Sequence, residues 1–321
     1  MKRVLVTGAN GFVGNRLCRV LHEKGYIIRA AFRQVVPTIN CCIRDRVAIG
    51  DISLGTNWEK SLHNMDCIVH LAARVHVMQD STIDPLAEYR KINVDATLNL
   101  ARQAAQTGVR RFIFLSTIKV NGEQTLPGKP FTEKDVPEPR DPYSISKYEA
   151  EKQLQELADE TGMEMVIIRP VLVYGPGVKG NFASMMHYLR KGVPLPFGAI
   201  HNRRSLVALD NLVDLIFICI EHSAAANQVF LVSDGNDVST TELFKQMAEA
   251  LNLSSRLIPI PERLLMLGAT ILGKQAFALR LLGSLQVDIS KAVDLLEWNP
   301  PVRMKEALRE TARHFLENTH L

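Results

Sequence analysis

The sequence predicts an α/β protein whose first half forms a doubly wound parallel sheet. Short apolar, β-branched runs alternate there with helical patterns, and the first run leads straight into a glycine turn. The runs are apolar throughout, which is typical of strands that helices bury on both faces. Strands and helices in alternation form βαβ units, and such units build a parallel sheet.

The strands and helices of the first half can be placed in chain order. The expected strands are 3–8 (RVLVTG), 26–32 (YIIRAAF), 46–51 (RVAIGD), 66–73 (DCIVHLAA), 111–117 (RFIFLST) and 163–170 (MEMVIIRP). The expected helices are 11–24, a short one near Trp58, 84–107 and 143–161. In the last of them, Ile145, Leu154 and Leu157 form part of an apolar stripe.

The alternation loosens after Pro170. Long glycine- and proline-containing connections separate helices there, with one strand expected at 228–234. Ser239 is a plausible N-cap of the following helix and Glu242 its capping-box partner. We therefore expect a first domain at 1–171 and a smaller, helix-rich domain that closes over a ligand at 172–321. Strands of the second part can return to the first sheet.

Composition excludes several classes of protein. The chain has 321 residues, 46% of them hydrophobic, which supports a sizeable core. Its net charge of +4 comes from interspersed charges without a basic run, so nucleic acid is not expected as a partner. The five cysteines lack paired metal-ligand spacing, which predicts no metal site and a reducing cytoplasm.

No segment predicts a signal peptide or a membrane span. The N-terminus runs from a strand into the glycine turn without an apolar signal region. The most lipid-like segment, 264–273, is much shorter than the roughly 20 residues of a membrane-spanning helix. Its sequence favours a buried or interface helix over peripheral membrane contact.

The glycine turn predicts a dinucleotide site. Gly8, Gly11 and Gly14 follow the first strand and open the first helix. Without Cβ atoms, the turn can be tight and the backbone can approach a pyrophosphate, which the N–H groups of the helix N-terminus then bind. Placed between the first strand and first helix of a βαβ series, these glycines indicate a Rossmann-type domain.

The end of the second strand bears on the choice of cofactor. A carboxylate at this position binds the ribose 2′-OH of NAD, whereas an arginine accepts the 2′-phosphate of NADP. The strand ends in Phe32 and Arg33, which favours NADP(H), with NAD(H) as the alternative if Arg33 is a solvated rim residue. Asp51 is placed to contact the adenine amino group, or else serves as a helix N-cap or turn aspartate.

Seven motifs in order carry a resemblance to a known family. They are TGANGFVG (7–14), GDI (50–52), HLAA (70–73), INVDATLNL (92–100), FLSTIKVNG (114–122), YSISK (143–147) and IRPVLVYGPG (168–177). Together the motifs resemble those of an extended short-chain dehydrogenase/reductase of the NAD(P)-dependent sugar-nucleotide epimerase/dehydratase type. The resemblance covers nearly the whole chain.

The resemblance implies three catalytic residues. Tyr143 would be the acid/base, Lys147 would lower the pKa of Tyr143 and bind the ribose, and Thr117 would orient the substrate oxygen. A tyrosine with a pKa of about 10 is a poor base until positive charge favours its phenolate. Tyr143 and Lys147 are i and i+4 on one helix face, so the ammonium group can supply that charge.

The resemblance also implies ligand contacts elsewhere. Further cofactor contacts are expected at Phe12, Val13, Ile52, Leu71, Ala72, Ala73, Asn93, Pro170 and Val173. Asn181 and Arg203 would hold a nucleotide diphosphate, with Arg204 as a rival for the same role. Lys119 and His76 are candidate sugar-specificity residues, or else a loop charge and a core histidine.

The function predicted first is reduction at C4 of a UDP-4-keto-6-deoxy-hexosamine by NADP(H), in surface-polysaccharide precursor synthesis. Arg33 and the departure of Val120-Asn121-Gly122 from the family's V-Y-G favour this reading over its runner-up, a UDP-hexose or UDP-hexosamine 4-epimerase. A non-catalytic dinucleotide sensor would not need Thr117. A flavonoid- or steroid-type ketoreductase would not need Arg203. The resemblance further implies a homodimer, paired through helices 84–107 and 143–161.

Overall fold

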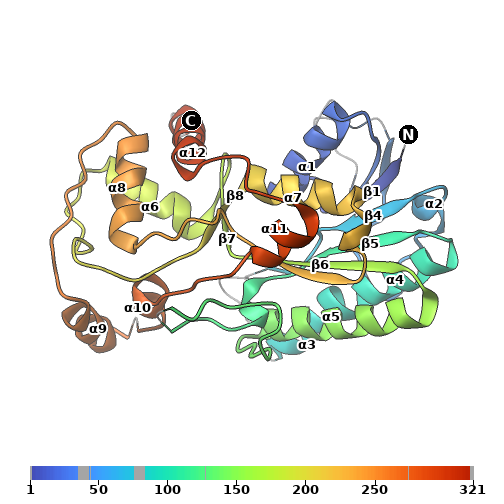
Figure 1. Cartoon of the computed structure of the whole chain (residues 1–321), viewed down its shortest axis with the longest axis horizontal. Coiled ribbons are helices and arrows are strands. Elements are labelled where there is room, and N and C mark those ends of the chain that lie inside the picture. The colour runs from blue at the N-terminus through green and yellow to red at the C-terminus, as the bar shows by residue number, and fades with distance from the viewer. Residues whose placement is uncertain are drawn as a thin grey trace.

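A seven-stranded parallel sheet organises the protein (Figure 1). The computed structural model describes residues 2–34, 43, 45–75, 84–126, 128–273 and 275–318. The strand order is β3-β2-β1-β4-β5-β6-β9, and every neighbouring pair is parallel. The strands are β1 (Arg3–Thr7), β2 (Ile27–Phe32), β3 (Asp45–Ala48), β4 (Cys67–His70), β5 (Arg111–Leu115), β6 (Glu164–Pro170) and β9 (Gln228–Val232). The predicted α/β fold with a doubly wound parallel sheet is confirmed.

Helices cover both faces of this sheet. One face carries α1 (Phe12–Glu23) and α7 (Leu209–Glu221), which pack against each other, while α11 (Ser290–Leu296) lies against β9. The other face carries α2 (Glu59–Leu62), α3 (Pro85–Arg90), α4 (Thr97–Gln106) and α5 (Pro142–Thr161) (Figure 1). The strands therefore have apolar side chains on both faces, as their uninterrupted apolar runs predicted.

The helix expected at 84–107 is not a continuous α-helix. A π-helical segment, Lys91–Ala96, separates α3 from α4. A π-turn adds a residue to the helix and changes the direction of its side chains, and such turns are frequent at functional sites. The segment contains Asn93, one of the predicted site residues.

Helix α5 begins and ends where its sequence predicts. Asp141 accepts a hydrogen bond from the backbone N of Ser144 at 2.7 Å, and the Ser144 hydroxyl accepts one from the Asp141 N–H at 3.1 Å. Pro142 occupies the first helical position, where its missing N–H costs nothing. Gly162 ends the helix at a φ of 74°. The helix therefore has a firmly capped first turn, which contains Tyr143.

The second part of the chain contributes to two regions. Strand β9 and helix α7 join the main sheet and its covering layer. A smaller region contains the parallel pair β7 (Leu172–Tyr174) and β8 (Leu206–Ala208), with α6 (Gly180–Arg190), α8 (Thr240–Ala250) and α12 (Met304–Asn318) packed around an apolar core. The capping box predicted for Ser239 and Glu242 is confirmed at the start of α8.

Two further helices lie beyond this core, α9 (Glu262–Ile271) and α10 (Gln275–Leu282). No residue of α9 is buried within the described chain, so of the two alternatives expected at 264–273, a buried helix and an interface helix, the buried helix is wrong. The chain packs against one side of α9 and leaves the other side open. In the part of the chain that the structure describes, no helix is both long and apolar enough to cross a bilayer.

Candidate active site

The glycine turn after β1 has no space for side chains. A Cβ atom on Gly8, whose φ is 67°, would lie 2.9 Å from the backbone nitrogen of Ala72. A Cβ atom on Gly14 would lie 2.1 Å from the carbonyl oxygen of Gly8. Gly11 is the N-cap of α1, and the first turn of α1 contains no acidic side chain. The turn thus presents backbone N–H groups and the positive end of the helix dipole to an anion.

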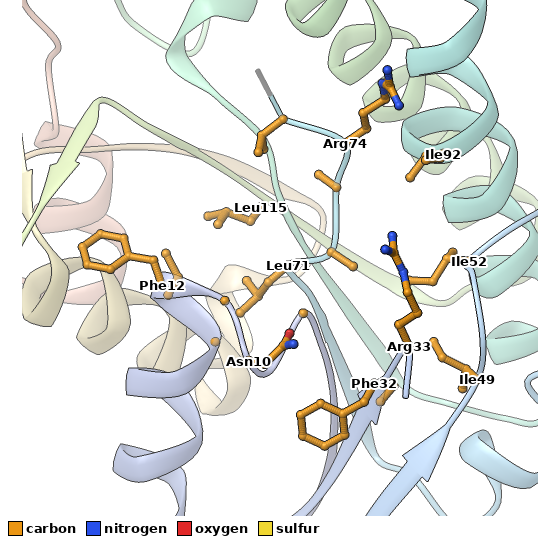
Figure 2. A pocket seen from close by; sticks show the side chains of 18 of the residues that line it. Asn10, Phe12, Phe32, Arg33, Ile49, Ile52, Leu71, Arg74, Ile92 and Leu115 are labelled. Atoms are coloured by element: carbon orange, nitrogen blue, oxygen red, sulfur yellow. The ribbon is translucent and has the colours of Figure 1, made fainter. Parts of the chain in front are cut away.

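A cavity of about 700 Å³ opens at the carboxyl ends of β1, β2, β4 and β5 (Figure 2). This is where open parallel sheets bind their ligands. The predicted residues that line it are Gly8, Gly11, Phe12, Val13, Gly14, Arg33, Asp51, Ile52, Leu71, Ala72, Ala73, Tyr143 and Lys147. Glycines, apolar side chains and a few charged groups fit a dinucleotide, so the residues present suit an NAD(P) cofactor.

Other lining residues were not predicted as cofactor contacts. They are Asn10, Ala31, Phe32, Ile49, Gly50, Arg74, Val75, Ile92, Leu115 and Ser116. Each of them lies within two residues of a predicted site residue, and most lie at or just after the carboxyl end of a strand, so position along the sheet edge is a signal that could have found them. Ile92 is different, because it comes from the π-helical segment (Figure 2).

Arg33 and Asp51 lie together at the rim of this cavity. The Nε of Arg33 lies 2.6 Å from Oδ1 of Asp51, and both side chains are more than three-quarters exposed. Figure 2 shows Phe32 and Arg33, from the end of β2, on the same side of the cavity as Ile49 and Ile52, which follow β3. The carboxylate missing from the end of β2 is therefore supplied by the next strand's loop.

Lys147 is buried beside the sheet. Its Nζ lies 4.1 Å from the centroid of the Phe114 ring, a cation–π distance. Burial lowers the pKa of Lys147 to about 7, although Glu151, one helical turn later, favours the charged form. The amine is therefore poised to gain or lose a proton near neutral pH.

Tyr143 lies against Tyr89, with the two ring centroids 6.1 Å apart in an edge-to-face arrangement. Burial raises the pKa of Tyr143 above that of a free tyrosine, and Asp141 and Tyr89 act in the same direction. The resemblance implies a lowered pKa instead. The difference arises because desolvation and the negative charge of Asp141 both disfavour the phenolate, so ionisation of Tyr143 requires additional positive charge.

Two hydroxyl groups follow β5. The Oγ1 of Thr117 accepts a hydrogen bond from the backbone N–H of Lys119 at 3.3 Å and caps a short 3₁₀ turn. Thr117 is buried but is not among the residues that line the cavity. Ser116 does line it, and its buried Oγ has no hydrogen-bond partner among the described residues. An unpartnered hydroxyl in a polar cavity is a candidate ligand group.

Lys119 contacts the N-terminal start of α5. Its ammonium group forms an ion pair with Asp141, the residue that caps the helix two positions before Tyr143. Both side chains are about one-quarter exposed. The charge that was expected to face the sugar thus also fixes the helix turn that carries the tyrosine.

Asn93 connects two parts of the site without lining the cavity. Its Oδ1 accepts a hydrogen bond from the backbone N–H of Arg74 at 2.8 Å. Its Nδ2 donates to the carbonyl of Arg74 at 3.1 Å and to the hydroxyl of Ser146 at 3.0 Å. The loop after β4 is therefore held against α5 by the residue for which the resemblance implied a cofactor contact.

Asn121 occupies the position where the family motif has tyrosine. Its Oδ1 accepts a hydrogen bond from Nη1 of Arg169 at 2.9 Å, and its Nδ2 donates to the carbonyl of Thr132 at 2.8 Å. Arg169 also forms a buried ion pair with Glu151, with Nη2 and Oε2 2.5 Å apart. The departure from the motif is accommodated by a closed polar network that joins Asn121 and Arg169 to Glu151 of helix α5.

The residues predicted to bind the diphosphate lie on the second part of the chain. Asn181 is exposed in the first turn of α6, and Arg203 is exposed, its backbone N–H donating to the Ser284 hydroxyl at 3.0 Å. The guanidinium of Arg204 instead donates to the carbonyls of Arg280 and Gly283 at 2.7 and 3.0 Å. Arg204 therefore has a structural role, which leaves Arg203 as the better candidate for a diphosphate.

The remaining predictions concern Pro170, Val173, His76 and metals. Pro170 ends β6 and Val173 is in β7, and neither lines the cavity. His76 lies outside the described residues. Among the residues that are described, no cluster of three or more His, Cys, Asp or Glu side chains could hold a metal ion.

Comparison with known proteins identifies the family. Residues 4–233 match the model of the NAD dependent epimerase/dehydratase family. A UDP-glucose 4-epimerase of Vibrio cholerae is 50% identical over 318 residues, 98% of this chain and 96% of its own. An N-acetyl-α-D-glucosaminyl-diphospho-ditrans,octacis-undecaprenol 4-epimerase of Escherichia coli O157:H7 is 28% identical, covering 83% of this chain and 77% of its own.

A solved structure agrees with this match. The UDP-glucose 4-epimerase of Thermotoga maritima, crystallised with UDP-glucose, superposes with a TM-score of 0.77. It is 26% identical, and the superposition covers 99% of each chain. The family match covers well over half of the chain, and the Vibrio cholerae relative matches it nearly from end to end. This protein therefore belongs to the NAD-dependent epimerase/dehydratase family of extended short-chain dehydrogenase/reductase enzymes.

Proposed function

We propose that this enzyme is a 4-epimerase of a UDP-hexose or UDP-hexosamine. The observation that carries the proposal is the 50% identity, over 98% of this chain, to a relative named UDP-glucose 4-epimerase. This favours epimerisation over the reduction that the sequence predicted first. The positions of Tyr143 and Lys147 in the cofactor cavity support chemistry at a carbon that carries a hydroxyl.

The residues of the site would share the work of epimerisation. A bound nicotinamide supplies an acceptor and donor for the hydride at C4 of the sugar. Tyr143 would remove the proton from O4 and later return it, while Lys147 stabilises the phenolate. Thr117 would hold O4 by a hydrogen bond. Arg203 and the amide of Asn181 would bind the diphosphate, so that the sugar can present either face while the nucleotide stays in place.

The contact between Arg33 and Asp51 bears on the cofactor. Arg33 alone favours NADP(H), because a guanidinium can donate two parallel hydrogen bonds to a 2′-phosphate. Ion-paired to Asp51, its charge is partly neutralised, and the carboxylate at this rim can accept a hydrogen bond from a ribose hydroxyl. We therefore propose NAD(H) as the resident cofactor, with NADP(H) as the alternative. An epimerase also gains from a cofactor that stays bound through both hydride transfers.

Reduction of a UDP-4-keto-6-deoxy-hexosamine is the second candidate function. Arg33 favours it, since a reductase that draws on the NADPH pool needs a site for the 2′-phosphate. Either activity would serve surface-polysaccharide precursor synthesis in the cytoplasm. A sensor without catalysis is disfavoured, because it has no use for a hydroxyl, a tyrosine and a lysine at Thr117, Tyr143 and Lys147.

We also propose a homodimer that pairs the α3–α4 and α5 faces of two chains. Both elements lie on one side of the molecule, and the side chains of Ile145 and Tyr148 on α5 are only half-buried in the single chain (Figure 1). Sedimentation of the purified protein tests the proposal. A species of monomer mass at micromolar concentration would contradict it.

One experiment separates the two activities. Purified protein is incubated with UDP-glucose and with UDP-N-acetylglucosamine without added reductant, and the C4 epimers are quantified by NMR. Parallel samples contain NADPH and UDP-4-keto-6-deoxy-N-acetylglucosamine, and the loss of NADPH absorbance is followed. Interconversion of epimers without consumption of reductant supports the proposal. Stoichiometric NADPH oxidation without interconversion would establish the reductase instead.

A further inference from the structure

The outer face of α9 exposes a row of large aliphatic side chains. Leu264 and Leu267 are each 58% exposed, Ile271 is 76% exposed, and Leu272, directly after the helix, is 72% exposed. We refer to these four residues as the α9 patch. Single exposed aliphatic residues are common on protein surfaces, whereas a contiguous group of them marks an interaction site.

The spacing of these residues places them on one side of the helix. Positions 264, 267 and 271 are three and four residues apart, so their side chains form one stripe. The opposite side of α9, which includes Leu265, Met266 and Ala269, packs on a small apolar cluster around Ile200. A helix with apolar side chains on two opposite sides is normally covered on both of them. The described chain covers the inner side of α9, so the outer side requires a partner.

The charges of the chain segment that contains the patch indicate what that partner is. Residues 251–286 contain four basic side chains, Arg256, Arg263, Lys274 and Arg280, against one acid, Glu262. The acid is directed toward the chain, where its Oε1 accepts a hydrogen bond from the backbone N–H of His201 at 3.0 Å. The three described arginines are exposed. An apolar stripe with basic neighbours is the pattern of helices that lie in the surface of anionic membranes.

We propose that the α9 patch docks this protein reversibly on an anionic lipid surface, with α9 in the plane of the headgroups. The aliphatic side chains would enter the boundary between headgroups and acyl chains, and the arginines would contact lipid phosphates. With ten residues, α9 is too short to cross the bilayer, so the contact is peripheral.

The position of α9 is compatible with this orientation. Figure 1 shows α9 and α10 at one end of the molecule, away from the seven-stranded sheet and its covering helices. A flat surface can approach this end without meeting the sheet. In Figure 1, the helices through which we propose dimerisation, α3, α4 and α5, lie beneath the sheet, to the right of α9 and α10, so the docking and dimerisation surfaces are distinct.

A second copy of the chain fits the patch less well. A two-fold contact would bring each patch against itself, and the neighbouring arginines of both chains would then face one another. Like charges at short range oppose such a contact, whereas lipid phosphates neutralise them. The charge pattern therefore favours the lipid surface.

Vesicle flotation with the purified full-length protein tests the proposal. Vesicles of phosphatidylglycerol and phosphatidylcholine are compared with vesicles of phosphatidylcholine alone. The variants are Ile271→Glu and Leu267→Glu, with Val136→Glu as the matched control, because Val136 is 81% exposed on a loop outside the patch. Melting curves confirm that each variant is folded.

We expect wild type and Val136→Glu to float with the anionic vesicles, and more weakly at high salt. Both patch variants should lose at least about tenfold in vesicle affinity, since each places a carboxylate among anionic headgroups. Epimerase turnover on a UDP-sugar should be unchanged in all of them, so failure of docking and failure of the proposed activity are distinguishable.

Two results would overturn the proposal. Wild type could fail to float with anionic vesicles, or the patch variants could float as well as wild type. In the first case, dissociation of an oligomer by Ile271→Glu in sedimentation would assign the patch to a second copy of the chain.

Discussion

Arg33 and Asp51, from loops that follow two neighbouring strands, form an ion pair at the rim of the cofactor cavity, with Nε and Oδ1 2.6 Å apart. Both side chains are largely exposed, so the pair itself contributes little to stability. The pair matters for cofactor recognition instead, because the carboxylate of Asp51 suits the ribose 2′-OH of NAD(H) and the guanidinium of Arg33 suits the 2′-phosphate of NADP(H).

Cofactor preference should follow this pair. In Asp51→Asn the charge of Arg33 is no longer balanced, so we expect the affinity for NADPH relative to NADH to rise about tenfold, the equivalent of one charged hydrogen bond. Arg33→Ala should shift the ratio in the opposite direction. Fluorescence titration of both nucleotides measures it, and a ratio that stays constant in both variants would place the adenosine elsewhere.

Tyr143→Phe should abolish most of the catalysis while keeping the fold. Loss of a general acid/base reduces turnover by roughly 10²–10⁴-fold, and the phenylalanine ring preserves the packing on Tyr89. The matched control is Tyr89→Phe, which removes a hydroxyl from the same aromatic pair. We expect Tyr89→Phe to retain most of the activity. Cofactor binding should be normal in both variants. Comparable losses of turnover in the two variants would contradict the assignment of Tyr143 as the acid/base.

Buried Lys147 should make stability depend on pH. Its pKa falls from 10.5 to about 7 on folding, so the folded chain binds fewer protons than the unfolded chain between these values. The cost of burying the ammonium group is fully present below about pH 7 and diminishes as the pH rises toward 10.5. Lys147→Met should therefore be more stable than wild type at low pH, by an amount that shrinks as the pH rises.

Urea denaturation across this pH range measures the difference in unfolding free energy. Lys152→Met, an exposed lysine on the same helix, is the control and should leave the pH dependence unchanged. A gap between wild type and Lys147→Met that stays constant with pH would contradict the assigned shift. The same lysine that costs stability is the one that the proposed chemistry requires.

Local patterns predicted the elements of the fold well. The uninterrupted apolar runs identify the strands, and the capping residues Asp141 and Ser239 mark helix starts, because these signals depend on neighbours in the chain. The π-helical segment around Asn93 was missed. The side chain of Asn93 is held by hydrogen bonds to Arg74 and Ser146, which are remote in sequence, so local patterns do not reveal this arrangement.

Side-chain pairs between distant segments explain most of what was not predicted at the site. Arg33 and Lys119 were interpreted singly, as ligand contacts, whereas each is paired with an aspartate from another loop. The exposure of α9 was also missed, because an apolar helix has the same composition whether it is buried or open. Such features depend on which segments meet in space.

Ser116→Ala should separate stability from ligand binding. A buried hydroxyl without a partner costs about 1–3 kcal/mol, so its removal should raise the unfolding free energy of the chain. If this hydroxyl binds the cofactor, the same change should weaken NAD(H) binding. Ser146→Ala is the contrasting control, because its hydroxyl donates to the carbonyl of Tyr143 at 2.7 Å and accepts from Asn93. Calorimetry measures both quantities, and unchanged cofactor affinity in Ser116→Ala would exclude the contact.

The buried pair of Arg169 and Glu151 supports the catalytic helix from below. The two side chains are 6% and 2% exposed, and Asn121 accepts a further hydrogen bond from the guanidinium. Arg169→Met leaves the carboxylate of Glu151 without its counter-charge, so we expect a loss of about 3–5 kcal/mol in the free energy of unfolding.

The double variant Arg169→Met with Glu151→Met removes both charges and should recover much of that loss, because the penalty lies mainly in the unpaired carboxylate. Denaturant titration of the two forms measures the recovery. Should the double variant be no more stable than Arg169→Met, the network would stabilise the helix through its hydrogen bonds to Asn121 rather than through charge. In either case turnover should fall less than in Tyr143→Phe, since neither residue lines the cavity.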